Sequence, residues 1–392
     1  MSETVIVSGA RTPIGKFLGG FADFTAMDLG GFAIAEALRR AGLSGQQIDY
    51  VIMGQVLQAG QGQITARQAA TKGGIPMDVP AITINKVCLS GLNAVHLADT
   101  LIRAGEIEIA IAGGMESMTN APYAMPKGRT GARMGDAKLV DLMIWDGLWD
   151  AFDHKHMGDG SDTVNSKRGI SRAEQDEWAA RSHERAADAT KAGRLRDEIV
   201  SVQIPQRKGE PILIEEDEGI RPGTTAESLA KLAPAFQKEG TITAGNASQI
   251  SDGGAAMVVM SADKARSLGL EPIATVVAHG QVAGPDNSLH LQPANAIKAA
   301  ASKAGLDAAG LDLYEMNEAF ASVAIASGKD LGVSEDRVNV NGGAVALGHP
   351  IGMSGARLIL TLANELKRRG GGTGAAALCG GGGQGDALII KV

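Results

Sequence analysis

The chain has 392 residues, of which 44% are hydrophobic and 21% charged, and its formal net charge is −7. This length and composition indicate a folded protein with a large core, built from two or three coupled subdomains. The negative charge argues against non-specific nucleic-acid binding, and no apolar run is long enough to span a bilayer, so we expect neither a nucleic-acid nor a membrane partner. The N-terminal stretch leads into an apolar run without a secretory signal pattern, which predicts a cytoplasmic protein.

The sequence repeats itself at a nearly constant offset. The stretch at 41–54, AGLSGQQIDYVIMG, aligns with AGLDAAGLDLYEMN at 304–317 (304 − 41 = 263). Further on, SGLNAVHLADTLIRAG from Ser90 aligns with SGARLILTLANELKRRG from Ser354 (354 − 90 = 264). A shared offset in two separate segments indicates a duplicated fold. Each copy alternates strands with helices, which predicts largely parallel sheets covered by helices in five layers, α/β/α/β/α.

The first copy shows the elements in order. Residues 81–85, AITIN, alternate at a two-residue period and predict a strand, and 338–341 predict its counterpart in the second copy. Apolar residues then recur at a helical period over 92–102. We expect Ser90 to cap this helix at its start and Gly105 to end it.

Between the two copies, at 120–249, the amino-acid composition changes. This part holds all three tryptophans, a polar helix-like run from Ser171 with Glu174 in capping-box position, and the acidic stretch IEEDEG at 214–219. We expect the charges of IEEDEG to form a solvated face. The predicted divisions are an N-terminal half over 1–119 plus 250–270, an inserted loop domain over 120–249 and a C-terminal half over 271–392.

The two cysteines are far apart in the chain and do not suggest a disulfide framework. Cys88 taken alone is most simply a small buried hydrophobe. It lies, however, between a predicted strand and a predicted helix, whose unpaired N–H groups and positive end favour a thiolate. Gapless alignment of the two copies sets Gly352 opposite it, in GHPIGMSG, and so brings His349 into the same region. An imidazole there can take the proton of the thiol, which indicates a nucleophile and its base.

Cys379 ends an apolar strand in AAALCGGGGQGD. Residues 380–385 satisfy G-x-G-x-x-G, but the chain that follows is too short for the helix of a dinucleotide site, and ALII reads as a closing strand. The glycines therefore predict close substrate approach and backbone N–H groups for an oxyanion. Neither cysteine has a C-x-x-C partner and HKH at 154–156 is a weak match, so we expect no metal site.

Asn317 and Glu318 follow an apolar strand in YEMNEAF, where the first copy has Gly54 and Gln55. The pair is open to two interpretations, an ordinary surface turn or a role acquired after the duplication.

Four motifs in this order and spacing resemble the thiolase family. They are NKVCLSG around Cys88, NEAF at 317–320, NVNGGAVALGHPIGMSGAR from Asn339 and LCGGGGQG from Leu378. The resemblance spans essentially the whole chain and is strongest to the short-chain bacterial acetyl-CoA acetyltransferases. It implies a duplicated thiolase-type fold and reversible condensation of two acetyl-CoA to acetoacetyl-CoA and coenzyme A.

The resemblance also implies roles for particular residues. Cys88, activated by His349, would carry the acetyl group, and Cys379 would take a proton from the second acetyl-CoA. Asn317 would hold a water that helps His349 stabilise the enolate, and the N–H groups of Cys88 and Gly381 would bind the tetrahedral oxyanion. The coenzyme A contacts that carry over are His156, Met157, Arg221, Ser228, Ala244, Ser248, Ala319 and Phe320.

The resemblance also implies a homotetramer, in which the segment at 120–138 joins two dimers. It implies no resident cofactor, since coenzyme A thioesters are substrates. Two departures leave the acyl-chain length open: Leu89, where many relatives have a small residue, and LHLQP at 289–293. The alternative function is a broader-chain degradative 3-ketoacyl-CoA thiolase of fatty-acid β-oxidation. More distant alternatives are a decarboxylating ketoacyl synthase, which needs no second cysteine, a lipid-binding protein that lost the reaction, and a redox sensor.

Overall fold

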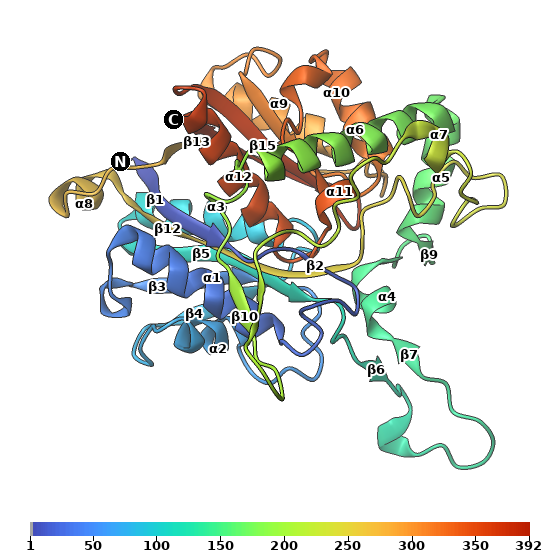
Figure 1. Ribbon diagram of the computed structural model, residues 1–392, viewed down its shortest axis with the longest axis horizontal. Coiled ribbons are helices and arrows are strands. Elements are labelled where there is room, and N and C mark those ends of the chain that lie inside the picture. Colours follow the sequence, from blue (N-terminus) through green and yellow to red (C-terminus); the bar gives the residue numbers. More distant parts are fainter. Residues whose placement is uncertain (1–2) are drawn as a thin grey trace.

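The computed structural model describes residues 3–392 (Figure 1). Met1 and Ser2, which belong to the stretch searched for a signal, lie outside the described residues. The largest sheet has ten strands in the order β14-β15-β16-β13-β1-β12-β5-β3-β4, with the short β2 beside β12. Their bounds are β1 (Thr4–Arg11), β2 (Gly15–Lys16), β3 (Tyr50–Gly54), β4 (Ala81–Ile84), β5 (Ile109–Ser117), β12 (Ser251–Ser261), β13 (Ala274–Ala283), β14 (Leu313–Met316), β15 (Thr373–Gly380) and β16 (Gln384–Lys391).

The two halves of this sheet meet at β1 and β13, which pair over only two positions, Val5 with Thr275 and Ile6 with Ala274. Strand β3 is parallel to β4 and β5, and β14 is parallel to β15. The pairs β1–β12, β12–β5, β13–β16 and β15–β16 are antiparallel. The prediction of largely parallel sheets is therefore wrong, because each half is completed by strands that return beside their neighbours, as β16 does after a tight turn.

The predicted strand at 338–341 is also wrong. Only Val338 makes a strand-like bridge, to Tyr314, and Asn339 has a φ of 48°. A left-handed residue cannot continue a pleated strand, so the segment is a loop and the second half has no counterpart of β4.

Helices cover both outer faces and fill the space between the two halves of the sheet (Figure 1). Helices α1 and α2 pack on the first half, α9 packs on the second half with α10 against it, and α3 and α12 contact each other between them. Buried apolar side chains form one central cluster and one under each outer layer. The predicted five-layer α/β/α/β/α arrangement is confirmed. The helices are α1 (Ala26–Ala41), α2 (Thr65–Lys72), α3 (Ser90–Ala104), α4 (Leu142–Gly147), α5 (Met157–Arg168), α6 (Arg172–Lys191), α7 (Ala226–Leu229), α8 (Ala262–Ser267), α9 (Gln292–Ala304), α10 (Ala321–Leu331), α11 (Ala344–Leu347) and α12 (Ser354–Arg368).

The two inner helices approach each other through equivalent glycines of the repeat (355 − 91 = 264). A Cβ on Gly91 would lie 2.9 Å from the backbone nitrogen of Ala356, and one on Gly355 would lie 2.3 Å from that of Leu92. Since real Cβ atoms do not come so close to backbone, only glycine allows this approach. The contact brings the N-terminal ends of α3 and α12 together.

The part between the halves adds three small hairpins and the helices α4 to α7. Its hairpins are β6 (Tyr123–Ala124) with β7 (Val140–Asp141), β8 (Trp149–Asp150) with β9 (Lys155–His156) and β10 (Val202–Ile204) with β11 (Ile212–Ile214). The capping box of Ser171 and Glu174 at the start of α6 is confirmed. No helix within residues 3–392 is both long and apolar enough to cross a membrane.

We expected the acidic stretch IEEDEG to be solvated throughout, but one of its side chains is buried. Asp217 is buried and forms a paired contact with the guanidinium of Arg11, with distances of 2.7 and 2.9 Å. It also accepts the N–H of Ile14 at 2.7 Å. Arg11 in turn bonds Glu198 at 2.7 Å. A buried arginine needs such partners, so one residue of the acidic stretch ties this segment to β1.

We predict that Asp217→Asn lowers the free energy of unfolding by about 3–5 kcal/mol, because it removes one partner of a buried ion pair. The matched control is Glu216→Gln at the exposed neighbouring position, for which we expect a change within about 0.5 kcal/mol. Urea unfolding of the two variants measures the difference. Equal unfolding midpoints would restore the interpretation of IEEDEG as a solvated face.

Candidate active site

Cys88 lies in the short loop between β4 and α3 and is buried. Val87 before it has a φ of 51°, a strained conformation for a β-branched residue. The predicted cap at Ser90 is wrong: Leu89 is the N-cap, without a side-chain hydrogen bond. The Ser90 hydroxyl instead accepts the N–H of Lys86 at 2.8 Å and donates to the carbonyl of Val87 at 2.6 Å. It therefore shapes the loop that holds the thiol, whereas Gly105 ends α3 in a left-handed conformation as predicted.

His349 lies in the loop between α11 and α12 and is also buried. Its Nδ1 is 2.6 Å from the hydroxyl of Ser354, and its Nε2 is 3.2 Å from the side-chain nitrogen of Asn317. The backbone N–H of His349 donates to the carbonyl of Gln249 at 3.1 Å. These contacts fix the ring from both sides.

A cavity of about 270 Å³ brings the predicted reactive groups together. Cys88, His349, Cys379 and Gly381 all lie on its wall, with Cys379 coming from the end of β15. Asn317 does not line the cavity, but its side-chain nitrogen contacts Nε2 of His349, which does. Five predicted coenzyme A contacts also line the cavity: His156, Met157, Ser248, Ala319 and Phe320.

Burial sets the charge of these groups. It raises the pKa of the Cys88 thiol to about 12, with a further contribution from Glu116. Burial and then the neighbouring Cys88 raise the pKa of Cys379 as well. Burial, with a smaller effect of Arg357, lowers the pKa of His349 to about 3. Burial thus works against the thiolate that we expected for Cys88 at the start of α3. The cavity holds two thiols and a neutral imidazole.

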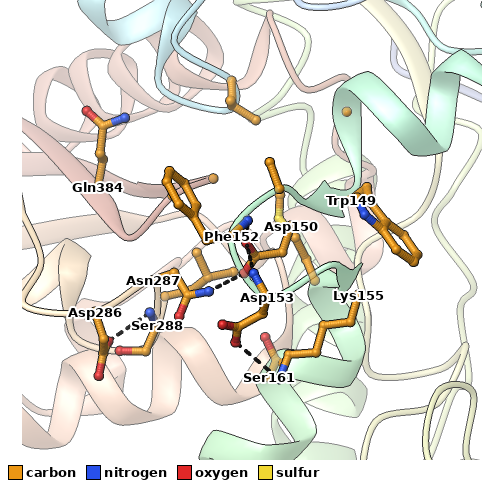
Figure 2. Close-up of a pocket in the computed structure, with 18 of the residues that line it drawn as sticks. Trp149, Asp150, Phe152, Asp153, Lys155, Ser161, Asp286, Asn287, Ser288 and Gln384 are labelled. Atoms are coloured by element: carbon orange, nitrogen blue, oxygen red, sulfur yellow. Dashed lines mark hydrogen bonds and ion pairs between the residues drawn. The ribbon is translucent and has the colours of Figure 1, made fainter.

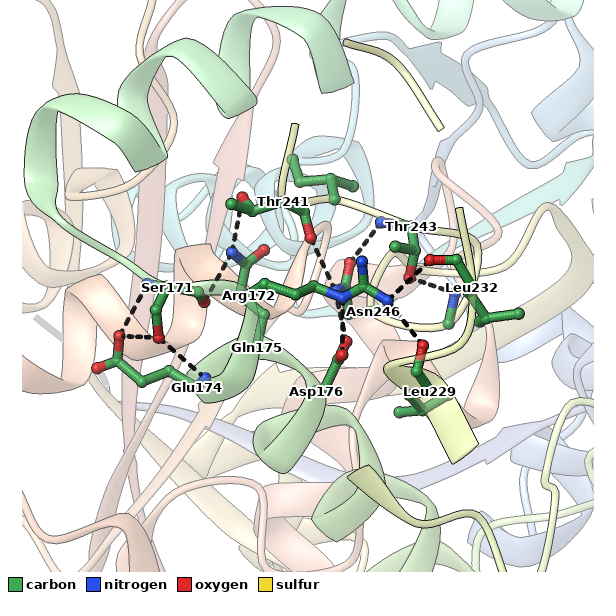
Figure 3. Close-up of polar contacts among 12 residues, drawn as sticks. Ser171, Arg172, Glu174, Gln175, Asp176, Leu229, Leu232, Thr241, Thr243 and Asn246 are labelled. Carbon is green, nitrogen blue, oxygen red and sulfur yellow. Dashed lines mark hydrogen bonds and ion pairs between the residues drawn. The ribbon is translucent and has the colours of Figure 1, made fainter. Parts of the chain in front are cut away.

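The remaining predicted contacts, Arg221, Ser228 and Ala244, are exposed and lie outside this cavity. The segment that carries Ser228 and Ala244 is anchored to the start of α6 (Figure 3). Arg172 donates to the carbonyls of Leu229 and Leu232, at 2.7 and 3.0 Å.

Asn246 supplies a second anchor for the same segment. Its amide donates to Asp176 at 2.9 Å, and its side-chain oxygen accepts the N–H of Thr243 at 2.8 Å (Figure 3). Because Ser248 follows two residues later, α6 holds both the exposed and the cavity-lining parts of this segment.

A second, wider cavity of about 710 Å³ adjoins the first, since Gly147, Met157, Leu289 and Gly381 line both. Figure 2 shows its wall, where Asp150 contacts Asn287 and the ring of Phe152 lies over the glycine turn after β15. The smaller cavity, which holds the predicted reactive groups, thus opens into a wider cavity with a partly polar wall.

The two departures from the family pattern occupy different places. Leu89 is fully buried, does not line the cavity, and packs on Gly380, where a Cβ would come within 2.6 Å of it. Leu289 does line the cavity, in an apolar cluster with Phe320 and Cys379. Leu89 thus packs behind Gly380, which lines the cavity, whereas Leu289 is the departure that lines the cavity directly.

Glu318 is not a surface turn residue. Its buried carboxylate accepts hydrogen bonds from Trp178 at 2.9 Å and Ser182 at 2.8 Å on α6, and from the N–H of Val345 at 3.0 Å. It therefore joins α6 of the inserted part to α11, the short helix before His349. Its difference from Gln55 in the first copy was the signal for this role.

Sequence reasoning missed Glu116, which is fully buried at the end of β5. Its carboxylate accepts the N–H groups of Val56, Leu57 and Gly352 at 3.0, 3.1 and 2.9 Å. It thus ties the loop of His349 to the first half. Burial raises its pKa to about 7, although the three donors oppose this. A charged residue inside an apolar strand, opposite Gly380 in the repeat (380 − 116 = 264), was the available signal.

Residues 380–385 lead into β16, so the closing strand predicted there is confirmed. Within residues 3–392 no group of three or more His, Cys, Asp or Glu side chains is arranged to hold a metal ion.

Comparison with known proteins places the chain in a family. Residues 4–263 match the thiolase N-terminal domain and residues 270–392 the thiolase C-terminal domain. The chain is 58% identical over 387 residues to a "Probable acetyl-CoA acetyltransferase" of Mycolicibacterium smegmatis, covering 99% of this chain and 100% of the relative. It is 52% identical to the acetyl-CoA acetyltransferase of Pseudomonas aeruginosa, covering 100% of this chain and 99% of the relative. It is also 52% identical to the acetyl-CoA acetyltransferase of Cupriavidus necator, with 100% of both chains covered. The chain belongs to the thiolase family.

Proposed function

We propose that this chain is an acetyl-CoA C-acetyltransferase, which reversibly converts two acetyl-CoA into acetoacetyl-CoA and coenzyme A. The observation that supports this most is that one small cavity is lined by both thiols and by an imidazole that burial keeps neutral. Full-length relatives named acetyl-CoA acetyltransferase support the substrate.

In the first half-reaction, the imidazole of His349 takes the proton of the Cys88 thiol while the sulfur attacks the carbonyl carbon of acetyl-CoA. The N–H groups of Cys88 and Gly381 stabilise the oxyanion that forms. Collapse of this intermediate breaks the bond to the coenzyme A sulfur, which takes the proton of the Cys379 thiol and leaves as free coenzyme A. The enzyme then holds an acetyl thioester, an imidazolium and a Cys379 thiolate.

In the second half-reaction, the Cys379 thiolate takes a proton from the methyl carbon of a second acetyl-CoA. The imidazolium of His349 and a water on Asn317 stabilise the enolate oxygen. The side-chain oxygen of Asn317 is buried without a partner, which supports a water at this position. The carbanion attacks the thioester, and the sulfur of Cys88 recovers its proton from His349. Both thiols and the neutral imidazole are restored.

Coenzyme A runs from the cavity to the surface of the inserted part in this proposal. His156, Met157, Ser248, Ala319 and Phe320 surround the pantetheine end, and Arg221, Ser228 and Ala244 lie further out. Because the chain has a net charge of −7, the guanidinium of Arg221 supplies local attraction for a phosphate. No resident cofactor is needed, since the thioesters are themselves substrates.

The assembly is a homotetramer in this proposal, and the protein is cytoplasmic. The excursion at 120–138 extends away from the main body (Figure 1) and exposes 64% of Tyr123 and 98% of Met134. Exposed apolar side chains of this size support burial against another copy. A broader-chain role in fatty-acid β-oxidation is not favoured by the names of the relatives.

We predict that Cys88→Ala abolishes covalent labelling by radioactive acetyl-CoA, because no other nucleophile lies in its place. Cys379→Ala keeps some labelling of Cys88 but lowers the condensation rate by about 10²–10⁴-fold, the usual contribution of a general base. Denatured protein is counted for bound acetate, and condensation is followed separately. Labelling that persists in Cys88→Ala would remove the acyl-enzyme proposal.

We predict that thiolysis prefers acetoacetyl-CoA over 3-ketoacyl-CoA substrates longer by two carbons or more. An added methylene that the pocket cannot hold costs about 1–3 kcal/mol, or roughly 10–200-fold in kcat/KM. Leu289→Ala widens the wall and reduces this preference, whereas Leu291→Ala, which packs on another cluster, does not. Equal kcat/KM across chain lengths in the unaltered enzyme would favour the broader-chain alternative.

A further inference from the structure

Two serines occupy equivalent positions in the duplicated halves. Ser90 begins α3 and Ser354 begins α12, 264 residues apart (354 − 90 = 264). Both hydroxyls bridge groups in the loop just before their helix. Ser90 joins the N–H of Lys86 to the carbonyl of Val87, at 2.8 and 2.6 Å. The bridge at Ser354 differs in one respect, because an imidazole nitrogen takes the place of the backbone N–H.

The hydroxyl of Ser354 donates to the carbonyl of Pro350 at 3.0 Å and lies 2.6 Å from Nδ1 of His349. A serine hydroxyl has one proton to donate. If that proton goes to Pro350, the oxygen can only accept from His349, so Nδ1 carries the hydrogen. Ser354 is 1% exposed and His349 5%, which leaves little room for water to compete.

The other ring nitrogen agrees with this arrangement. The side-chain nitrogen of Asn317 lies 3.2 Å from Nε2 of His349 and can donate only to a bare nitrogen. The opposite tautomer would place two donors against each other here, or turn the amide of Asn317. It would also require Ser354 to give up its bond to Pro350. Three polar contacts thus favour one tautomer.

We infer that Ser354 is a positioning residue that fixes the Nδ1–H tautomer of His349 and leaves Nε2 as the atom that takes the proton of Cys88. Ser354 does not line the cavity, so it acts only through His349. The role in proton transfer rests on the proposed function, whereas the tautomer itself does not. The equivalent Ser90 of the first copy bridges Lys86 and Val87 in the loop of Cys88, so equivalent serines support both loops.

Protein labelled with ¹⁵N in its histidines tests this directly. The chain has seven histidines, and the spectrum of His349→Asn identifies the signals of His349 by difference. In the unaltered enzyme we expect a protonated Nδ1 and a bare Nε2 from pH 6 to 8. Ser354→Ala should add the Nε2–H form or exchange between both forms. Ser354→Thr, which keeps a hydroxyl, should restore the original spectrum.

Activity provides a second readout. Ser354→Ala should lower kcat at least about tenfold with little change in KM, since part of the enzyme has the wrong nitrogen protonated. The rate of Cys88 alkylation by iodoacetamide between pH 6 and 9 should fall in the same variant. The matched control is Ser322→Ala, because Ser322 is a buried serine that contacts another buried histidine, His290, at 3.2 Å. It should leave the signals of His349, kcat and alkylation unchanged.

A protonated Nε2 in the unaltered enzyme would overturn the inference. An unchanged spectrum in Ser354→Ala would do so as well, even with a lower kcat, since the loss would then reflect stability alone. If Cys88→Ala still accepts the acetyl label while the tautomer behaves as expected, the proposed function fails and the assignment of Ser354 stands.

Discussion

The close approach of α3 and α12 is the constraint on which the reactive centre depends. Gly91 and Gly355 let the two helices meet at backbone distance, and a Cβ on either would collide with the other helix. Gly114 on β5 repeats the pattern, because a Cβ there would lie 2.0 Å from the carbonyl oxygen of Gly352. Each helix begins directly after a reactive loop, so this contact sets Cys88 and His349 beside one cavity. Larger residues at these glycines would separate the loops before they affected the rest of the core.

Buried carboxylates then hold the loops that the helices bring together. Glu116 ties the loop of Gly352 to β5 and to the segment after β3. Glu318 joins α11, the short helix before His349, to α6 of the inserted part. Each carboxylate accepts several N–H or hydroxyl donors, which offsets the cost of its burial. The polar network therefore connects three parts of the chain that are far apart in sequence, and links α6 of the inserted part to the segment that carries His349.

Burial also sets the protonation states of Cys88, Cys379 and His349 before any reaction. Burial favours protonated thiols and a neutral imidazole, so it disfavours charge on these three side chains. A desolvated thiol is a poor nucleophile until a base takes its proton. In the proposed mechanism, ionisation of Cys88 is thus coupled to attack on the thioester, and the histidine must present an unprotonated nitrogen. This requirement gives the contact between Ser354 and His349 its importance.

Much of this organisation could be predicted from the sequence because it depends on local pattern and on repetition. The offset of 264 residues indicated the duplication, the layered fold and the meeting of Cys88 with His349. The order of the motifs indicated the family, which the full-length matches confirm. Helix ends such as Gly105 and the capping box at Ser171 follow from nearby residues, so they were predictable as well.

The incorrect predictions concern features that depend on distant partners. Alternating residues at 338–341 form no strand, because the left-handed Asn339 and its contacts with β14 override local propensity. Asp217 is buried because Arg11 needs a carboxylate, and the two are 206 residues apart. Leu289 lines the cavity while Leu89 packs behind it on Gly380, which no local pattern distinguishes. The sequence by itself determined the duplicated fold, the family and the candidate reactive residues. Only the tertiary structure decided the sheet directions, the charge states and the side chains that support His349, because burial and long-range contacts set all three.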